Sequence, residues 1–320
     1  MNVAIIIVNY RTAGLTIDCL ASLAPERERM PGLRVYLTDN ASGDGSVDLL
    51  RKSIDENGWG DWVHLRPLPR NGGFSYGNNE GIREAIAVEP RFDSILLLNP
   101  DTYIRPGAVL TLVEFLERHP DVGIAGSRLE DPDGTAQRSA FRFPTVASEF
   151  EQSLKFGPVS RLLASKLVAP PVPEADCPTG WVAGASMLIR RSVFDAIGLL
   201  DEAFFMYYEE VDFCLRAARA GFPCWYVPES RVVHLVGQAS GVTNAAKSRR
   251  RRPGYWFDSR RRFFIRNYGR AYAVAADLAH STAYMACRMR CLLTGKASAD
   301  PERYLRDFFG HNALMRGTEP

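Results

Sequence analysis

The sequence has 320 residues, of which 46% are hydrophobic and 24% are charged, and this balance excludes a disordered chain and indicates a soluble globular protein. Its length predicts one large domain with an appendage, or two domains. The formal net charge of +2 hides a split, since residues 1–246 hold 23 Lys and Arg against 31 Asp and Glu, whereas residues 247–320 hold 16 against 6. We therefore expect residues 247–320 to meet a different surface or partner from the rest.

The cysteines and the amino-terminal residues indicate the cellular compartment. No basic stretch precedes the apolar residues 3–8, and Asn9, Tyr10 and Arg11 follow them directly, so we expect no secretory signal peptide. The six cysteines are scattered without a CxxC pair, which favours neither a zinc ribbon nor a disulfide scaffold. This pattern predicts a reducing compartment, and hence a cytoplasmic protein.

Short apolar runs alternate with amphipathic stretches through the first half of the chain. Strands are predicted at residues 3–8, 35–38, 63–65, 95–98 and 122–125. Helices are predicted at residues 15–23, 46–57, 76–88 and 107–118. Nearly continuous apolar strands separated by helices predict an α/β fold, with a mostly parallel sheet covered by helices on both faces.

The second half is less regular. Prolines cluster in residues 144–178 and predict an irregular surface segment or a mobile loop. A strand is then expected at residues 184–191, a helix in the later part of 204–221, and two short strands in 224–237. Residues 271–293 are apolar enough for a helix, but charges such as Asp277 and Arg288 make a transmembrane span too costly.

Polar residues gather at the carboxyl ends of the predicted strands, where parallel α/β sheets bind their ligands. The stretches are Asn9-Tyr10, Asp39-Asn40, Asn71-Gly72-Gly73 and Asn99-Pro100-Asp101. No GxGxxG or GxxxxGK[ST] motif is present, which disfavours a dehydrogenase and a P-loop enzyme. A carboxylate such as Asp101 can instead hold Mg²⁺ or Mn²⁺, which grips a diphosphate. A turn or helix cap is the alternative role for Asp101.

Seven segments in order resemble the family 2 inverting glycosyltransferases of the GT-A fold, especially the bacterial rhamnosyltransferases of O-antigen and exopolysaccharide assembly. They are VNY, TDNAS, NGGFSYGNNEG, LLLNPDT, TGWVAGASMLIRR, FFMYYEEVDFCLR and VVHL. The resemblance covers residues 3–240. It implies a GT-A-type, Rossmann-like domain over residues 1–246 and a basic, helical C-terminal extension over residues 247–320.

The resemblance also implies a donor site. Asp101 matches the last aspartate of the family's metal motif, whose leading aspartate is Asn99 here, and His234 matches a metal or phosphate contact. Asp39 matches the carboxylate that accepts a hydrogen bond from the donor base, although a turn-forming role is the alternative. The other matched positions are Val8 and Tyr10 beside the base, Asn71, Gly73 and Asn79 beside the nucleoside, and Trp181 and Gly184 beside the sugars.

The acidic run at residues 209–212 is the candidate catalytic group. An inverting transfer requires a base for the acceptor hydroxyl, and a carboxylate within hydrogen-bond reach can serve. The family's aspartate base aligns with Glu210, which is one methylene longer, so Glu209 and Asp212 stay open as candidates. The alternative is that these acidic residues only stabilise the first turn of a helix, where the helix dipole favours negative charge.

Residues 247–270 combine ten Lys and Arg with one acid and interleaved aromatic residues. This mixture suits an anionic membrane surface, where arginines meet phosphates and aromatic rings enter the interface. RNA binding, a solvated charge run or a homo-oligomer contact would also account for it. We interpret the extension as a peripheral dock on the inner face of the cell membrane.

The resemblance therefore implies a metal-dependent glycosyltransferase that uses Mg²⁺ or Mn²⁺. The expected donor is dTDP-rhamnose, and the expected acceptor is a hydroxyl of a lipid-linked or other saccharide. The alternatives are a UDP-sugar donor, or a nucleic-acid-binding or partner-binding protein with a degenerate GT-A domain. Nucleotidyl transfer is disfavoured, because the stretch NYRTAGLT after the first strand has only one arginine and one glycine to grip a triphosphate.

Overall fold

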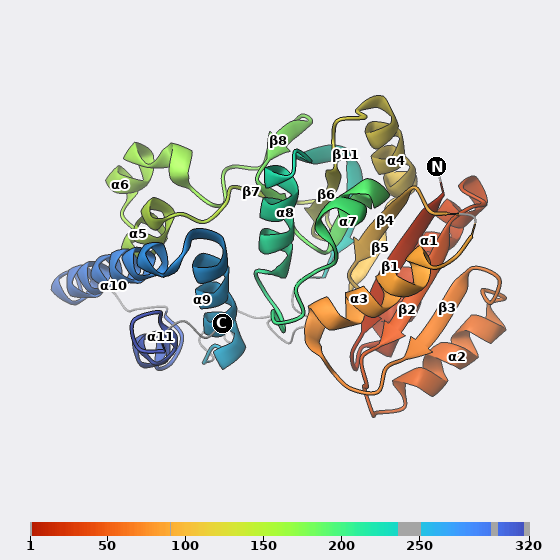
Figure 1. Ribbon diagram of the computed structural model, residues 1–320, viewed down its shortest axis with the longest axis horizontal. Helices are drawn as coiled ribbons and strands as arrows, with labels where there is room; N and C mark the ends of the chain where they lie inside the picture. The colour runs from red at the N-terminus through yellow and green to blue at the C-terminus, as the bar shows by residue number, and fades with distance from the viewer. Residues whose placement is uncertain (1, 90, 236–250, 296–299, 317–320) are drawn as a thin grey trace.

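The computed structural model describes residues 2–89, 91–235, 251–295 and 300–316. Its first part is an α/β layer built on a nine-stranded sheet, and its second part is a group of helices beside that layer (Figure 1). We call this group the helical lobe. It comprises α5 (Val146–Leu154), α6 (Gly157–Leu162), a 3-10 turn at Ala164–Lys166, α9 (Gly254–Tyr268), α10 (Arg270–Leu293) and α11 (Tyr304–His311).

The sheet confirms the predicted α/β class. Its strands lie in the order β3 (Val63–Pro67), β2 (Arg34–Asp39), β1 (Val3–Asn9), β4 (Ser94–Leu98), β10 (Ser186–Arg190), β6 (Ile124–Glu130), β11 (Cys224–His234) and β5 (Thr102–Ile104), with β8 (Cys177–Thr179) also paired to β11. Six of these strands run parallel to one another, whereas β10, β5 and β8 run antiparallel. A separate two-stranded sheet joins β7 (Ala140–Phe141) to β9 (Trp181–Val182).

Helices cover both faces of the sheet, as the apolar strands predict. Alternate residues of β1 enter opposite cores, with Ile5 and Ile7 on one side and Ala4 and Ile6 on the other. The first core also takes side chains from α1 (Ala13–Arg29), α2 (Ser46–Glu56) and α4 (Ala108–Arg118). The second takes side chains from α3 (Gly73–Ile86), α7 (Arg191–Ile197) and α8 (Glu209–Arg219).

The region predicted as two short strands in residues 224–237 is a single strand, β11. Its register against β6 shifts between Val227 and Arg231. Pro228 lies inside that shift and cannot donate a backbone hydrogen bond, so the ladder is interrupted there without ending the strand. Residues 236 and 237 lie outside the described residues.

The prediction of an irregular segment or mobile loop at residues 144–178 is wrong for its first half, which forms α5 and α6. A reciprocal cap starts α5, in which Thr145 Oγ1 accepts from Ser148 N at 3.2 Å and Ser148 Oγ accepts from Thr145 N at 2.8 Å. The proline-rich composition concealed this signal. Because α5 packs against α10, tertiary contacts from the far end of the chain stabilise it.

Many basic side chains of the C-terminal extension contact carboxylates of neighbouring elements. Lys247, Arg249 and Arg250 lie outside the described residues. Most of the arginines of residues 251–270 pair with carboxylates in the structure. The pairs are Arg251 with Asp307, Arg260 with Glu149 and Asp277, Arg261 with Asp258, and Arg262 and Arg266 with Asp201. Most of the charge of α9 therefore faces neighbouring elements rather than an outer surface, and the predicted helix at residues 271–293 is confirmed as α10.

Candidate active site

Asn9 ties the ends of β1 and β2 together. Its Nδ2 donates to Asp39 Oδ2 at 2.6 Å, and its Oδ1 accepts from the Thr16 hydroxyl at 3.0 Å. The buried Asp39 carboxylate also accepts from Ser42, at Oδ1 from the backbone N–H and at Oδ2 from the hydroxyl. Within the described chain, Oδ1 accepts only that one hydrogen bond, so it retains capacity for a further donor. The sequence pointed to Asp39 but not to the supporting roles of Asn9 and Ser42.

Val8 and Tyr10 flank Asn9 at the end of β1. Val8 lies against α3, where a Cβ on Gly77 would come within 2.6 Å of Val8 Cγ1, so glycine permits the close approach of helix and strand. Tyr10 is 36% exposed, and the Arg11 guanidinium lies 5.1 Å from its ring centre. Tyr10 thus presents an aromatic face to solvent beside the buried Asp39.

The loop that carries Asn71 and Gly73 is fastened on two sides. Asn40 Nδ2 donates to Asn71 Oδ1 and to Gly73 O, both at 3.0 Å. Gly73 has a φ of +85°, and a Cβ there would lie 2.0 Å from the carbonyl oxygen of Phe205, which accepts from Phe74 N at 2.7 Å. The loop therefore connects the end of β2 to the segment that precedes α8.

Asn79 faces a different segment from the other predicted donor residues. Its Nδ2 donates to Leu200 O at 2.9 Å and to Glu202 Oε1 at 3.0 Å, and its Oδ1 accepts from Leu200 N at 3.1 Å. These contacts fix the connection between α7 and α8. The structure thus gives Asn79 a positioning role for the segment that leads to Glu209 and Glu210.

Asn99, Asp101 and His234 lie together at the ends of β4 and β11, although His234 is far from the other two in sequence. His234 Nε2 is 3.4 Å from Asp101 Oδ1 and 3.5 Å from Asn99 Nδ2. The antiparallel pairing of β11 with β5 sets this arrangement, since it places His234 opposite Thr102. Asp101 is buried, and the His234 side chain is 15% exposed.

This group fits a divalent cation that a ligand helps to hold. Asp101 offers carboxylate oxygens and His234 an imidazole nitrogen, while the buried Asn99 Oδ1 accepts no hydrogen bond from any described residue. Mg²⁺ prefers oxygen ligands, and Mn²⁺ takes oxygen and nitrogen. In the described ranges no cluster of three or more His, Cys, Asp or Glu could hold a metal alone. Oxygens of a bound ligand would therefore have to complete the coordination.

Glu209 and Glu210 begin α8 directly after two residues with left-handed backbone, Tyr207 at φ 70° and Tyr208 at φ 68°. Such strain in residues other than glycine is uncommon and clusters at functional sites. The Oε2 atoms of both glutamates are buried without a hydrogen-bond partner in the described part of the chain. Burial raises the pKa of Glu210 to about 7, and burial together with the Glu210 charge raises the pKa of Glu209 well above its usual value. A carboxylate of this pKa is suited to accept a proton near neutral pH.

The segment just before β10 lies between Glu210 and the predicted metal group. Ala185 O accepts from Asn99 N at 3.1 Å. A Cβ on the neighbouring Gly184 would lie 3.9 Å from Glu210 Cβ and 3.4 Å from Phe74 Cζ. Glu210 and Asn99 therefore contact adjacent residues of one segment, and the structure brings the predicted base, Gly184 and the predicted metal group into one site.

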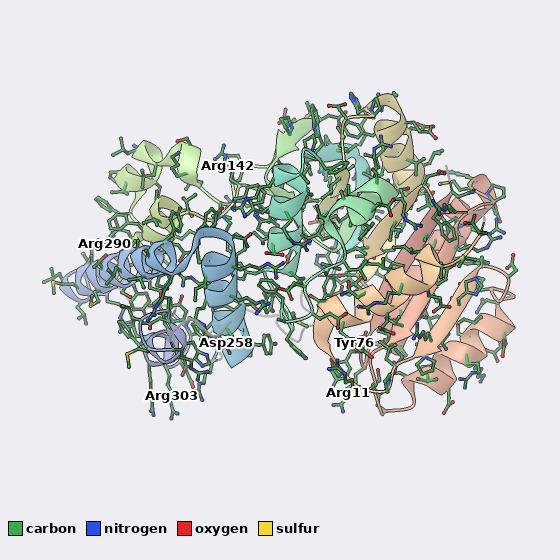
Figure 2. All side chains as sticks on the ribbon, in the orientation of Figure 1. Arg11, Tyr76, Arg142, Asp258, Arg290 and Arg303 are labelled. Atoms are coloured by element: carbon green, nitrogen blue, oxygen red, sulfur yellow. The ribbon has the colours of Figure 1, made fainter. Side chains whose placement is uncertain are left out.

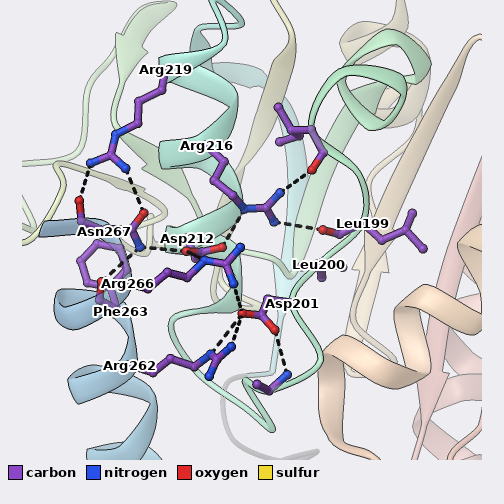
Figure 3. A network of polar contacts seen from close by, with 12 residues as sticks. Leu199, Leu200, Asp201, Asp212, Arg216, Arg219, Arg262, Phe263, Arg266 and Asn267 are labelled. Carbon is purple, nitrogen blue, oxygen red and sulfur yellow. Dashed lines mark hydrogen bonds and ion pairs between the residues drawn. The ribbon is translucent and has the colours of Figure 1, made fainter. Parts of the chain in front are cut away.

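Asp212 belongs to a separate network on the side of α8 that faces α9 (Figure 3). Its Oδ2 accepts from Arg216 Nε at 2.8 Å, and its Oδ1 accepts from Asn267 Nδ2 at 2.8 Å. Arg216 in turn donates to the backbone carbonyls of Ile197 and Leu199. The Asp212 side chain is fully buried among these partners, so it fastens α8 to the helical lobe.

Trp181 fills space beside β7. Its ring stacks on Phe141 with centroids 4.2 Å apart, and its Nε1 donates to Arg142 O at 3.1 Å. Trp181 is a partly buried member of the core on the α8 face of the sheet and of a third core, which α8 forms with α9 and α10. These contacts satisfy the indole N–H and pack the ring of Trp181 against β7.

This fold is that of the GT-A glycosyltransferases. The mannosyltransferase PcManGT from Pyrobaculum calidifontis, solved with GDP-Man and Mn²⁺, matches with a TM-score of 0.56 and 16% identity over 99% of this chain and 81% of that chain. Staphylococcus aureus TarS residues 1–349, solved with UDP-GlcNAc, matches with a TM-score of 0.57 and 13% identity over 100% of this chain and 82% of that chain.

The sequence comparisons give the family. Residues 1–255 match the family described as "Glycosyltransferase like family 2", and the chain belongs to this family of glycosyltransferases. The N-acetylglucosaminyl-diphospho-decaprenol L-rhamnosyltransferase of Mycobacterium tuberculosis is 30% identical over 233 residues, which are 69% of this chain and 72% of that protein. The rhamnosyltransferase WbbL of Escherichia coli K12 is 30% identical over 169 residues, which are 51% of this chain and 61% of that protein.

Proposed function

We propose that this chain transfers L-rhamnose from dTDP-β-L-rhamnose, with inversion, to a hydroxyl of a lipid-linked saccharide in cell-surface polysaccharide synthesis. The names of the two rhamnosyltransferase relatives support the sugar, and the decaprenol-linked compound in the name of the first supports the acceptor class. Work on such an acceptor would place the enzyme at the inner face of the cell membrane. The observation that carries the proposal is the grouping of Asn99, Asp101 and His234 around the same segment as Glu210.

The ends of β1 and β2 would hold the nucleoside. Asp39 Oδ1 is positioned by Ser42 and can accept from the ring N–H of thymine, while the exposed Tyr10 ring offers a face to the base. Asn71 and Gly73 would line the other side of the nucleoside, because their loop is tied to Asn40. Uracil presents the same ring N–H, so a UDP-sugar is the alternative donor.

Asp101, His234 and Asn99 would hold the cation. A bound Mg²⁺ or Mn²⁺ supplies positive charge that stabilises the diphosphate as it leaves the sugar. The chain contributes one carboxylate and one imidazole, and Asn99 in place of a second carboxylate leaves the group less negative. We therefore expect the metal to bind together with the donor.

Glu210 would act as the base. In its ionised form it accepts the proton of the acceptor hydroxyl, whose oxygen bonds to the anomeric carbon as the bond from that carbon to the diphosphate oxygen breaks. Burial and the Glu210 charge raise the pKa of Glu209 well above its usual value, which favours its protonated form and limits negative charge beside the departing diphosphate. Asp212 is disfavoured as the base because Arg216 and Asn267 already hold its carboxylate.

A donor screen with the pure protein tests this proposal. We expect Mg²⁺ or Mn²⁺ to support release of nucleoside diphosphate from dTDP-rhamnose above all other sugar nucleotides, and EDTA to abolish it. Asp101→Ala should lose transfer while its thermal unfolding stays at the wild-type temperature, and the exposed Asp55→Ala serves as the matched control. Preferential turnover of a UDP-sugar would replace the donor. No turnover of any sugar nucleotide, or full activity of Asp101→Ala, would reject the proposal.

A further inference from the structure

Exposed apolar side chains are concentrated on the helical lobe. In the described ranges, ten of the thirteen large hydrophobic residues that are exposed lie there, and only Tyr10, Leu49 and Val88 lie on the α/β layer. The ten are Phe156, Leu162, Leu278, Met285, Met289, Leu292, Leu293, Phe309, Leu314 and Met315. A soluble monomer normally scatters such residues, so their concentration on one part of the molecule indicates a surface that another body covers.

Four of these residues form a stripe along α10. Leu278, Met285, Met289 and Leu292 are spaced by seven, four and three residues, which places them on one face of an α-helix. Their exposure rises toward the end of the helix, from 52% at Leu278 to 78% at Leu292, and the adjacent Leu293 reaches 83%. This end of α10 projects away from the sheet (Figure 1).

The opposite face of α10 is firmly held, so the stripe does not result from a loosely packed helix. Asp277 accepts from Arg260 Nη1 at 2.6 Å and from Ala313 N at 2.8 Å. His280 Nδ1 lies 2.8 Å from the Ser153 hydroxyl of α5. Near the tip, Arg290 donates to the carbonyls of Leu154 and Lys155. The lobe therefore presents the stripe rigidly.

The exposed charges of the helical lobe and the described residues that adjoin its helices are almost all positive. In residues 146–166 and the described part of residues 251–316, ten Lys and Arg are exposed against one acid, Glu302. The ten are Lys155, Arg161, Lys166, Arg251, Arg252, Arg266, Arg270, Arg303, Arg306 and Arg316. Figure 2 shows Arg303 on the outer side of α11. An apolar stripe bordered by positive charge complements an anionic lipid surface.

We propose that the helical lobe docks on an anionic lipid bilayer, with the α10 stripe and the tip residues Met289, Leu292 and Leu293 inserted at the interface. No described helix is long and apolar enough to cross a membrane. Basic side chains such as Arg303 and Arg306 would contact the lipid phosphates. The inference deepens the proposed function, since a lipid-linked acceptor requires the enzyme at the bilayer, but docking itself needs neither donor nor acceptor.

Vesicle flotation of the full chain tests the docking surface without any substrate. The vesicles contain either phosphatidylcholine alone or phosphatidylcholine with phosphatidylglycerol. We expect binding to the anionic vesicles that falls at least tenfold when salt is raised from about 0.1 M to about 1 M, because salt screens the charges. Leu292→Ser with Leu293→Ser should lower the partition coefficient at least tenfold. The matched control is Leu49→Ser with Val88→Ser, two exposed apolar residues of the α/β layer, which should bind as the wild type does.

Arg303→Gln with Arg306→Gln should weaken binding to the anionic vesicles about tenfold and leave the weak binding to neutral vesicles unchanged. The docking proposal is overturned if the wild-type chain does not float with anionic vesicles, or if the two leucine substitutions change nothing. It is equally overturned if light scattering shows a lipid-free dimer that these substitutions dissociate, because the stripe would then be a contact between copies. Nucleoside diphosphate release with a soluble acceptor separates the two proposals, since the leucine variant should keep it at the wild-type level.

Discussion

Buried carboxylates have opposite surroundings in the helical lobe and in the active site. In the lobe, Glu149 accepts from Arg260 at 3.0 Å and 2.8 Å and lies 3.2 Å from His280. Burial alone would raise its pKa, but Arg260 and the contact with His280 lower the pKa of Glu149 to about 2. In the active site, the half-buried Glu210 has no such cation beside its buried Oε2 atom among the described residues, and its pKa rises to about 7.

Both kinds of buried carboxylate, with and without a cationic partner, occur on α8. Asp212 lies two residues beyond Glu210 on α8, yet Arg216 and Asn267 hold its carboxylate. A buried, unpaired carboxylate costs stability, whereas a paired one anchors its neighbours. We infer that α8 is fastened by Asp212 so that Glu209 and Glu210 can be kept without cationic partners. The paired carboxylates should then govern stability and the unpaired ones activity.

The largest expected effect is on catalysis. Glu210→Gln removes the base without changing the size of the side chain, and we expect transfer to fall about 10³-fold, within the range of general-base catalysis. The measurement is the initial rate of nucleoside diphosphate release with acceptor at saturating donor. Glu210→Asp is the control, because it keeps a carboxylate and should recover part of the rate.

Equal loss in Glu210→Gln and Glu210→Asp would indicate that the residue positions α8 rather than accepting a proton. Thermal unfolding of both variants tests whether the loss of rate results from unfolding of the protein. Glu210→Gln should raise the unfolding temperature, since it removes a carboxylate whose charge no neighbouring cation compensates.

The converse change in the lobe should destabilise the protein and spare the chemistry. Arg260→Met leaves Glu149 and Asp277 buried without their cation, and breaking such a pair costs about 3–5 kcal/mol. Urea unfolding should show this loss, while the rate per folded molecule at low temperature stays at the wild-type level. Arg270→Met, at an exposed position, is the control and should change stability by less than about 0.5 kcal/mol. Unchanged stability of Arg260→Met would contradict the comparison.

The pH profile sharpens the comparison with a smaller effect. Glu210 works as a base only when it is ionised, and its pKa is about 7, so the rate should fall about tenfold for each pH unit below 7 and level off above it. Glu209→Gln should leave the midpoint near 7, because burial rather than a charge on Glu209 raises the pKa of Glu210. A midpoint near the ordinary glutamate pKa of about 4.3 would show that water or a positive charge stabilises the ionised Glu210 carboxylate in the working enzyme. That result would contradict the comparison.

The sequence was sufficient for the fold because the sheet depends on local patterns. Apolar runs such as residues 3–8 and 95–98 are buried on both faces, and their periodicity is visible without any tertiary contact. The segment at residues 144–178 was misjudged because α5 depends on α10, more than a hundred residues away. Likewise, the hydrogen bond of Asp212 with Asn267 and the ion pairs of Arg260 depend on partners distant in sequence, which no spacing reveals.

The site was predicted by residue type and order, but its support was not. Asp101 and His234 were expected together, and β11 brings them to 3.4 Å. Asn9 was missed as a hub because its role depends on Ser42 and Thr16, which only the fold brings near it. The left-handed backbone at Tyr207 and Tyr208 gives no sequence signal, since tyrosine has no preference for that conformation.

The smallest predicted effect concerns Gly184, which lies between Glu210 and the predicted metal group. Gly184→Ala adds a methyl group 3.4 Å from Phe74 Cζ and 3.9 Å from Glu210 Cβ, which are ordinary contacts, so we expect a stability change within about 0.5 kcal/mol. The methyl group nevertheless occupies volume that a sugar would enter, so KM for donor or acceptor should rise about three- to tenfold with little change in kcat. Gly73→Ala is the contrasting variant, because its Cβ would strike the Phe205 carbonyl and its φ is +85°, so it should destabilise the loop outright. An unaltered KM in Gly184→Ala would mean that the sugar lies away from Glu210, and the base would then have to be sought elsewhere.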